Sequence, residues 1–460
     1  MSMKRSPLKR IRTAIILLCL ALIVGIIAYA FFSQNNNTVL EKEKIESNLE
    51  KYSGQDFGYD YISSYIEKYG IGNLNNYKLN YIESRLEKDF YKDLPAEYEI
   101  AKTACELYLQ YFYDNVDNND SDAVTDAIIH CLFAATGDKY AYYRNPDEFQ
   151  EYLSSLQGGS SFVGIGVMVD LATLKVNMVY RGSGAEEAGI KRGDIIYAVE
   201  GTTVSDVVTT EQLTTMLRGE VNTSVNVTIK RGDKLIDMVV VRKALTEQSV
   251  SYELDSDKVG YIYITQFLGS TVNEFKEAVD FCTNNGAVAL VIDVRGNPGG
   301  LLESVVNIID YLIPDAENRM IATYNQGNKK YVFNTEDGHG VNIPIAVVCN
   351  GGTASAGELF TAAMRDFNNQ NVIDAIVVGS TTYGKGVIQT SYSIYDGSGI
   401  TYTVGYYNPP CDVNFDGIGI TPDFQVEDVS IEDVPFNTAK EEILNIVYKN
   451  GKTSAFLPAA

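Results

Sequence analysis

A chain of 460 residues is long enough for two or three domains, and its 45% hydrophobic and 21% charged residues are typical of globular protein. The formal net charge is −23 at pH 7, although the first twelve residues hold five basic side chains and no acidic one. An acidic body repels phosphate groups, which argues against nucleic-acid binding.

The amino terminus predicts that most of the chain is exported. A basic tail (1–12) precedes residues 13–32, which carry no charge and would span about 30 Å as a helix, enough to cross a bilayer. By the positive-inside rule the tail stays cytoplasmic, so we expect a single-pass membrane protein with an extracytoplasmic catalytic body. A cleaved signal peptide is the alternative, because 28–30 reads Ala-Tyr-Ala, and the body would then be secreted.

Residues 33–157 are predicted to be helical, because apolar side chains recur at helical spacing among Glu and Lys. This region is rich in tyrosine, and aromatic residues at helical spacing are mostly packing or subunit contacts, so a homodimer is plausible.

Residues 158–245 change to short β runs separated by glycine turns, with two short helices at 185–188 and 210–217. This pattern describes a compact, partly open β-barrel. Residues 246–430 alternate strands and helices, which predicts an α/β domain with a mainly parallel sheet. Residues 431–460 hold a closing amphipathic helix, expected over 438–450, and a tail.

Ser355 follows a predicted buried strand, 345–349, and precedes a predicted helix at Ala356. The N–H groups and dipole of a helix start favour negative charge, and a serine that attacks a carbonyl needs such donors for the resulting oxyanion. The alternative is that Ser355 only caps the helix. The glycine-rich loop 296–300 follows another central strand, and its N–H groups could supply a second donor, although a tight turn explains the glycines equally well.

A serine nucleophile also needs a base. The chain has two histidines, His130 in an apolar helical segment and His339 in a polar loop, so a Ser–His–Asp triad is possible but has little support. Lys385 lies between two glycines beyond an apolar strand, and a lysine can act as a base where burial lowers its pKa. Gln389 could orient the amine. The alternative is a solvated turn lysine.

These residues belong to a series of motifs in a fixed order, which begins with Gly-Asp-Lys-Tyr at 137–140. The later motifs are Phe162-Val163-Gly164-Ile165-Gly166, 182–194, 260–264, Asp293–Gly300, Thr353–Glu358, Tyr383–Gln389 and 417–423. The series resembles the C-terminal processing peptidases, tail-specific Ser–Lys endopeptidases with an inserted PDZ domain.

The resemblance implies a crotonase- or Clp-like protease core and no cofactor. It implies Ser355 as nucleophile, Lys385 as general base and Gln389 as the residue that positions the lysine. It also implies an oxyanion hole from the backbone N–H of Ala356 and of Gly299 or Gly300. The Phe162–Gly166 segment would bind the C-terminal tail of a polypeptide substrate, and Arg218 matches a position implicated in gating.

Two departures from the family and two rival functions remain open. Ser355 and Lys385 are thirty residues apart, more than is usual, and the surplus falls in the polar turn 368–374. Gly357 replaces a commoner serine. A catalytically silent PDZ scaffold and a crotonase-like acyl-transfer enzyme are the rival functions. Residues 412–423 imitate a calcium loop but lack its final Glu, so a turn is favoured. The six scattered cysteines give no zinc spacing or disulfide framework, although one pair could form.

Overall fold

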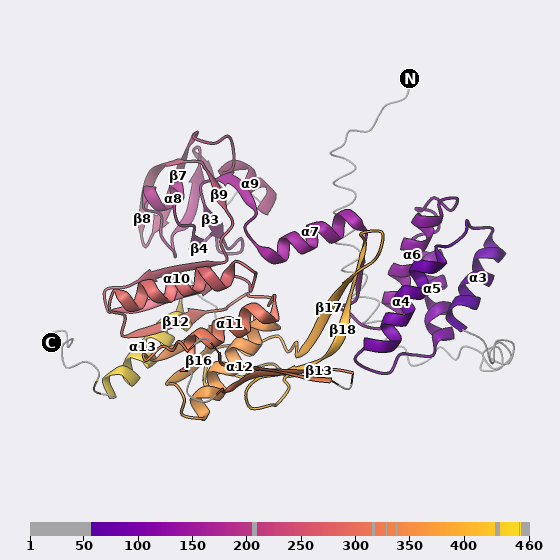
Figure 1. Cartoon of the computed structure of the whole chain (residues 1–460). Helices are drawn as coiled ribbons and strands as arrows, with labels where there is room; N and C mark the ends of the chain where they lie inside the picture. Colours follow the sequence, from indigo (N-terminus) through magenta and orange to yellow (C-terminus); the bar gives the residue numbers. More distant parts are fainter. Residues whose placement is uncertain are drawn as a thin grey trace, which may run out of the picture.

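The computed structural model describes residues 57–204, 209–314, 318–327, 329–336, 338–427, 433–449 and 451. A bundle of helices, a small β-domain and an α/β core are visible as three lobes (Figure 1). Helix α7 (Pro146–Gln157) runs between the bundle and the small domain.

The α/β core is built on a six-stranded sheet in the order β10-β11-β12-β15-β16-β19. All neighbouring strands are parallel except β10 and β11, which confirms the predicted, mainly parallel sheet. The strands are β10 (Val250–Leu254), β11 (Val259–Ile264), β12 (Ala289–Asp293), β15 (Ile345–Cys349), β16 (Ala375–Gly379) and β19 (Phe424–Gln425). The central strands are buried along their whole length because helices cover both faces, which explains their unbroken apolar runs.

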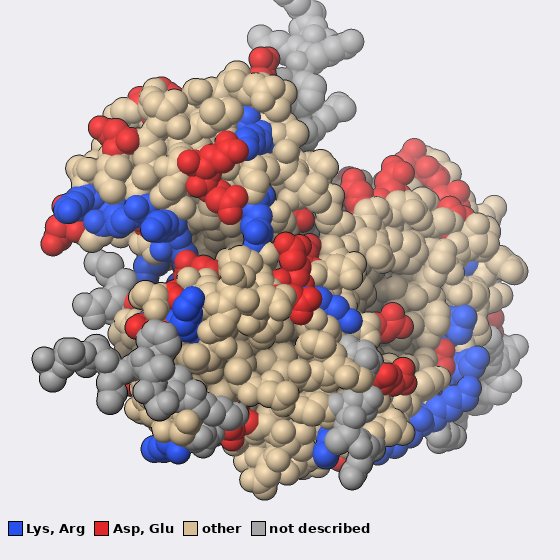
Figure 2. Space-filling view, turned by 60° about the vertical axis from the view of Figure 1, so that its left-hand side comes forward, with Lys and Arg blue, Asp and Glu red and all other residues tan. Residues whose placement is uncertain are grey.

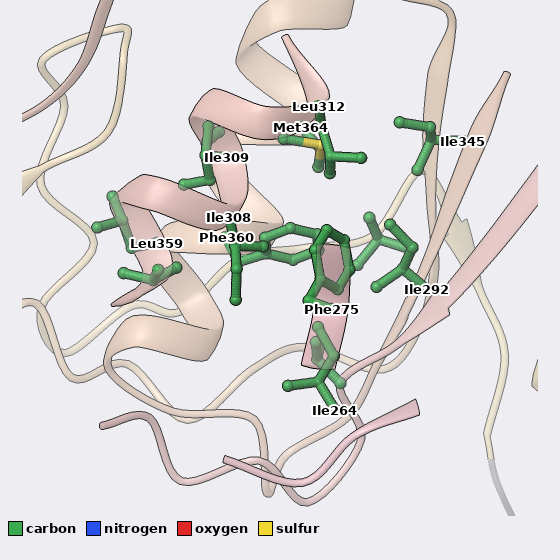
Figure 3. Close-up of a cluster of buried hydrophobic side chains, with 14 of the residues drawn as sticks. Ile264, Phe275, Ile292, Ile308, Ile309, Leu312, Ile345, Leu359, Phe360 and Met364 are labelled. Carbon is green, nitrogen blue, oxygen red and sulfur yellow. The ribbon is translucent and has the colours of Figure 1, made fainter. Parts of the chain in front are cut away.

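Three helices pack on one face of this sheet, α10 (Thr271–Asn284), α11 (Leu302–Leu312) and α12 (Ala356–Asn369). Figure 3 shows the centre of that core, where Phe275 of α10 and Phe360 of α12 lie with Ile292 and Ile345 of the sheet. Helix α13 (Val434–Lys449) packs on the other face. It begins four residues before the helix expected there.

A second, antiparallel sheet was not predicted from the sequence. Its strands are β1 (Tyr142–Arg144), β13 (Met320–Gln326), β14 (Lys329–Asn334), β17 (Val387–Ser393) and β18 (Gly399–Asn408). The β17–β18 hairpin reaches from the α/β core to the helical bundle (Figure 1), where Ile400 and Tyr402 enter the core of the bundle. The turn between the strands reads Asp-Gly-Ser-Gly, a recognisable hairpin signal.

The bundle contains α3 (Phe57–Tyr69), α4 (Asn76–Asp89), α5 (Glu97–Tyr111) and α6 (Ser121–Ala135), in agreement with the predicted helical region. Some of its tyrosines are packing residues, since Tyr65 and Tyr108 are buried in its core, whereas Tyr69, Tyr77 and Tyr111 are exposed. The predicted homodimer stays a prediction.

The small domain has eight short strands and two helices within the residues that the structure describes. They are β2 (Ser161–Gly164), β3 (Val167–Val169), β4 (Val176–Val179), α8 (Gly184–Ala188), β5 (Ile195–Val199), β6 (Thr202–Thr203), α9 (Thr210–Leu217), β7 (Ser224–Arg231), β8 (Lys234–Val241) and β9 (Lys243–Thr246). Both predicted helices are present, and the strands surround one main apolar cluster and a smaller one at Met178, Tyr180 and Leu245.

The predicted membrane segment, residues 13–32, lies outside the described residues. Among the helices that the structure does describe, none is long and apolar enough to cross a membrane. This finding contradicts the expected single-pass membrane location of the chain, and we do not retain that prediction.

Candidate active site

Ser355 lies at the turn between β15 and α12 in a backbone conformation that is unusual for a residue with a side chain. Its φ is 54° and its ψ is −119°. Such a conformation costs on the order of 1–3 kcal/mol, so the surrounding structure must hold it. The N–H of Ser355 donates to a carboxylate oxygen of Glu358 at 2.9 Å. Ser355 is therefore presented on a fixed, sharp turn at a helix start.

The glycine loop after β12 lies directly against this turn. A Cβ atom added to Gly299, whose φ is 106°, would stand 2.7 Å from the Cβ of Ser355 and 3.0 Å from the N of Ala356. Only glycine permits this approach. The fully buried Asn297 fastens the loop, because its carbonyl accepts from Ala354 N–H at 2.9 Å and its side chain donates to Ile264 O at 3.0 Å.

The two predicted loop donors differ in the structure. The N–H of Gly299 already donates to Asn297 Oδ1 at 2.8 Å. Within the described parts of the chain, no acceptor is paired with the N–H of Gly300 or of Ala356. Ala356 N–H therefore stands next to Ser355 as a donor ready for an oxyanion, whereas Gly299 N–H would first have to leave Asn297.

Lys385 lies in the turn between β16 and β17, and its amine is largely buried. The Nζ atom stands 4.2 Å from the centre of the Tyr140 ring, and no carboxylate of the described chain forms an ion pair with it. Burial lowers the pKa of Lys385 to about 8; Asp138 and Glu358 oppose this shift, whereas Lys139 adds to it. About a tenth of the amine is therefore neutral at pH 7, several hundred times more than for an ordinary lysine, as a general base requires.

Glu358 joins the serine turn to the lysine turn, and the sequence reasoning did not assign it a role. Its side chain is fully buried and accepts four hydrogen bonds. The donors are Ser355 N–H at 2.9 Å, Lys385 N–H at 2.7 Å, Gly384 N–H at 2.6 Å and the Thr382 hydroxyl at 2.6 Å. The Ser-x-x-Glu spacing is a capping-box signal that could have drawn attention to it.

Tyr407 of β18 is a further link between the two residues. Its hydroxyl donates to the backbone oxygen of Lys385 at 2.8 Å. Burial raises the pKa of Tyr407 well above its ordinary value, an effect that the neighbouring Ser355 hydroxyl opposes. The Tyr407 hydroxyl therefore lies beside both the Ser355 side chain and the backbone of Lys385.

Gln389 does not contact the lysine amine in this structure. Its side-chain nitrogen donates to Val387 O at 3.2 Å and to the Thr403 hydroxyl at 3.4 Å. A β-bulge between Ile388 and Gln389 alters the alternation of side chains there. The predicted role of Gln389 in positioning Lys385 therefore requires a change of its side-chain conformation.

The predicted tail-binding segment and Arg218 meet at one pocket of about 290 Å³. Its lining includes Phe162, Gly164, Ile165, Gly166 and Arg218, but not Val163. The Arg218 guanidinium lies 5.5 Å from the centre of the Phe162 ring. A larger cavity of about 700 Å³ lies at 86–98 in the helical bundle and contains none of the predicted site residues.

A cluster of charges connects the small domain to the core beside the glycine loop. Asp433 accepts from Arg192 of the small domain at 2.9 Å and from Arg295, which follows β12, at 2.8 Å. Burial would raise the pKa of Asp433, but Arg295 and Arg192 outweigh it and lower the pKa. Figure 2 shows basic side chains along the edge of the small domain that faces the core.

The remaining candidate residues lie in other surroundings. His130 stacks on Phe112 in the bundle, and His339 stacks on Tyr311, so neither ring is placed as a partner of Ser355. In the calcium-like loop, Asp412 accepts from Lys330 and Asp416 accepts from Gly386 N–H. Five cysteines lie in the described ranges, and all five are free thiols.

Comparisons with known proteins identify the family of the chain. The model of peptidase family S41 matches residues 258–426, and a PDZ domain model matches residues 175–231. The chain is 30% identical over 356 residues to the carboxy-terminal processing protease CtpA of Bacillus subtilis, covering 77% of this chain and 73% of that protein. It is 31% identical over 345 residues to a probable CtpA-like serine protease of Staphylococcus aureus, covering 74% of this chain and 65% of that protein.

Among solved structures, a putative S41 protease from Bacteroides fragilis is similar over 80% of this chain and 99% of that one. Its sequence identity is 17% and its TM-score 0.49, a likeness too weak to support an argument by itself. The sequence matches are sufficient without it: this chain belongs to peptidase family S41, as a serine-type peptidase of the carboxy-terminal processing kind with a PDZ domain.

Proposed function

We propose that the protein is an endopeptidase in which Ser355 is the nucleophile and Lys385 the general base. The observation that carries this proposal is the shared carboxylate of Glu358, which accepts from the backbone N–H of both residues. Lys385 meets the requirement for a base, since its amine is buried without an ion pair among the described residues and its pKa is lowered to about 8.

In the proposed reaction the neutral amine of Lys385 takes the proton of the Ser355 hydroxyl while the oxygen attacks the carbonyl carbon of a peptide bond. The oxyanion accepts a hydrogen bond from Ala356 N–H and a second one from the glycine loop. The Lys385 ammonium then returns the proton to the leaving amine, and water resolves the acyl-enzyme by the same steps. We retain Gln389 in the proposal as the residue that orients the amine once its side chain has turned from Thr403.

We further propose that the PDZ domain binds the C-terminal tail of the polypeptide substrate. The pocket at Phe162–Gly166 has the apolar side chains of Phe162, Ile165 and Leu217 for a terminal side chain. Strand β2 lies at its border, so a tail could add to it as a further strand, and loop N–H groups would receive the carboxylate. The gating role of Arg218 is part of this proposal, supported by its place at the pocket beside Phe162.

The test uses the full chain and casein, a disordered polypeptide. We expect wild-type protein to cleave it, and Ser355→Ala and Lys385→Ala each to lose at least about a thousandfold in kcat while circular dichroism and the unfolding midpoint show a folded protein. A fluorophosphonate probe should label wild type but not Ser355→Ala.

Lys449→Ala is a matched control, because this exposed lysine of α13 is not among the groups that shift the pKa of Lys385 and has no role in the proposed reaction. Turnover by Lys385→Ala at the rate of the control would refute the assigned base. A wild-type chain that binds tails but cleaves no substrate would instead be a silent PDZ scaffold.

A further inference from the structure

The ring of Tyr140 lies over the amine of Lys385, although Tyr140 belongs to a segment outside the residues matched by the peptidase family model. The distance from Nζ to the ring centre is 4.2 Å. An aromatic ring this close occupies the space in which water would otherwise hydrate the amine, which disfavours the ammonium form. The ring face attracts a cation, which partly opposes this effect.

Tyr140 is held in place by its neighbour Asp138, which is 6% exposed. The Asp138 carboxylate accepts from Tyr140 N–H at 3.0 Å, from Thr403 N–H at 2.8 Å and from the Thr403 hydroxyl at 3.1 Å. Thr403 pairs with Gln389 in the β17–β18 hairpin, and β17 continues directly from Lys385. The turn that carries Tyr140 is thus fixed to the same hairpin as the lysine.

The hydroxyl of Tyr140 does not account for this placement. It is buried without a partner of good hydrogen-bond geometry among the described residues, although the nearby Lys139 amine opposes the rise of its pKa on burial. A buried hydroxyl without a good partner costs on the order of 1–3 kcal/mol, so the oxygen adds little stability and the ring is the part of Tyr140 that contacts Lys385.

Charged and titratable groups from several elements face this site. They are Asp138 and Lys139 of the turn after α6, Glu358 of α12, Tyr407 of β18 and, around the two tyrosines, Asp416. Asp138 and Glu358 favour the ammonium form of Lys385, but both carboxylates already accept hydrogen bonds from other donors. Burial of the amine, to which the Tyr140 ring contributes, is the larger influence.

We propose that Tyr140 is a positioning residue for the base, whose ring excludes water from the Lys385 amine and holds that amine toward Ser355. This inference rests on the proposed Ser–Lys mechanism. It assigns the Gly-Asp-Lys-Tyr motif a part in the active site: Asp138 anchors the turn, and Tyr140 covers the base.

The test is the pH dependence of kcat/KM for casein cleavage by the full chain, between pH 6 and 10. Tyr140→Ala admits water to the amine, which should raise the pKa of Lys385. The rise of kcat/KM on the acidic side of the pH profile, the acid limb, should therefore move to higher pH by about one unit or more. Its activity at pH 7 should fall at least about tenfold and recover largely at pH 10. Tyr140→Phe keeps the ring and should retain the wild-type limb. Tyr140→Leu keeps an apolar side chain and should shift less, and it serves if the alanine variant does not fold. Tyr142→Ala, at an exposed tyrosine of the same segment, is the matched control.

An unmoved acid limb in Tyr140→Ala or in Tyr140→Leu would overturn the inference, and so would an equal shift in Tyr140→Phe, which would point to the hydroxyl. These outcomes differ from failure of the proposed function. If Ser355→Ala and Lys385→Ala are inactive while the alanine variant keeps the wild-type limb, only the role of Tyr140 is lost. If Lys385→Ala is active, the Ser–Lys mechanism itself is lost.

Discussion

The buried amine of Lys385 should make the protein less stable at neutral pH, and Lys385→Met should relieve that cost. Methionine has a similar length and no charge. The pKa of Lys385 falls from 10.5 to about 8 on burial. A difference of this size corresponds to roughly 3 kcal/mol between the two protonation states.

The direction in which stability changes with pH follows from which state of the protein binds the proton. The unfolded chain protonates this lysine below about pH 10.5, whereas the folded protein does so only below about pH 8. The penalty on the folded state therefore grows as pH falls from 10.5 to 8 and is constant below. Lys385→Met should be more stable than wild type by up to roughly 3 kcal/mol at pH 7, and the gain should vanish near pH 10.5.

Guanidinium unfolding of wild type and variant at pH 7 and pH 10.5 measures this difference. Lys385→Arg keeps a permanent charge and should show no gain. Lys139→Met should show none either, because burial lowers the pKa of Lys139 less than its neighbours raise it, so that pKa stays above the ordinary value. Equal stability of wild type and Lys385→Met at both pH values would refute the argument that burial neutralises the amine. Lys385→Met should be inactive, so stability and activity oppose each other at this position.

Three further changes test the surroundings of the site. Glu358→Gln leaves one acceptor oxygen for four donors. It should lower the free energy of unfolding by about 3 kcal/mol and reduce kcat. An unchanged unfolding midpoint would contradict the linking role of this carboxylate. Gly299→Ala places a Cβ atom 2.7 Å from the Cβ of Ser355. It should lower kcat about a hundredfold with little change in KM. A wild-type kcat would show that the loop can shift freely. Asp433→Asn weakens the bonds to Arg192 and Arg295 and should lower the free energy of unfolding by about 2 kcal/mol. The PDZ domain should then be held less firmly, and a protease should cut between the domains faster. A wild-type digestion pattern would show that other contacts hold the domain.

Local pattern was sufficient for much of the fold. The apolar run at Ile345–Cys349 and the amphipathic run that follows predict a buried strand and a helix, and both exist within a residue or two of the expected limits. The glycine turns of the PDZ domain and the mainly parallel sheet were predicted for the same reason, since spacing and turn residues are local properties. The β17–β18 hairpin was not predicted, although its Asp-Gly turn is a local hairpin signal.

The amino-acid sequence by itself determined which side chains are available for catalysis, the order of the elements that carry them and the family to which the chain belongs. Only the tertiary structure decided their surroundings. Glu358 collects N–H groups from two turns, Tyr140 reaches Lys385 from a distant segment, and Gln389 bonds to Thr403 instead of the amine. Burial and long-range contacts set the pKa of a base, and the spacing of residues along the chain does not determine either of them.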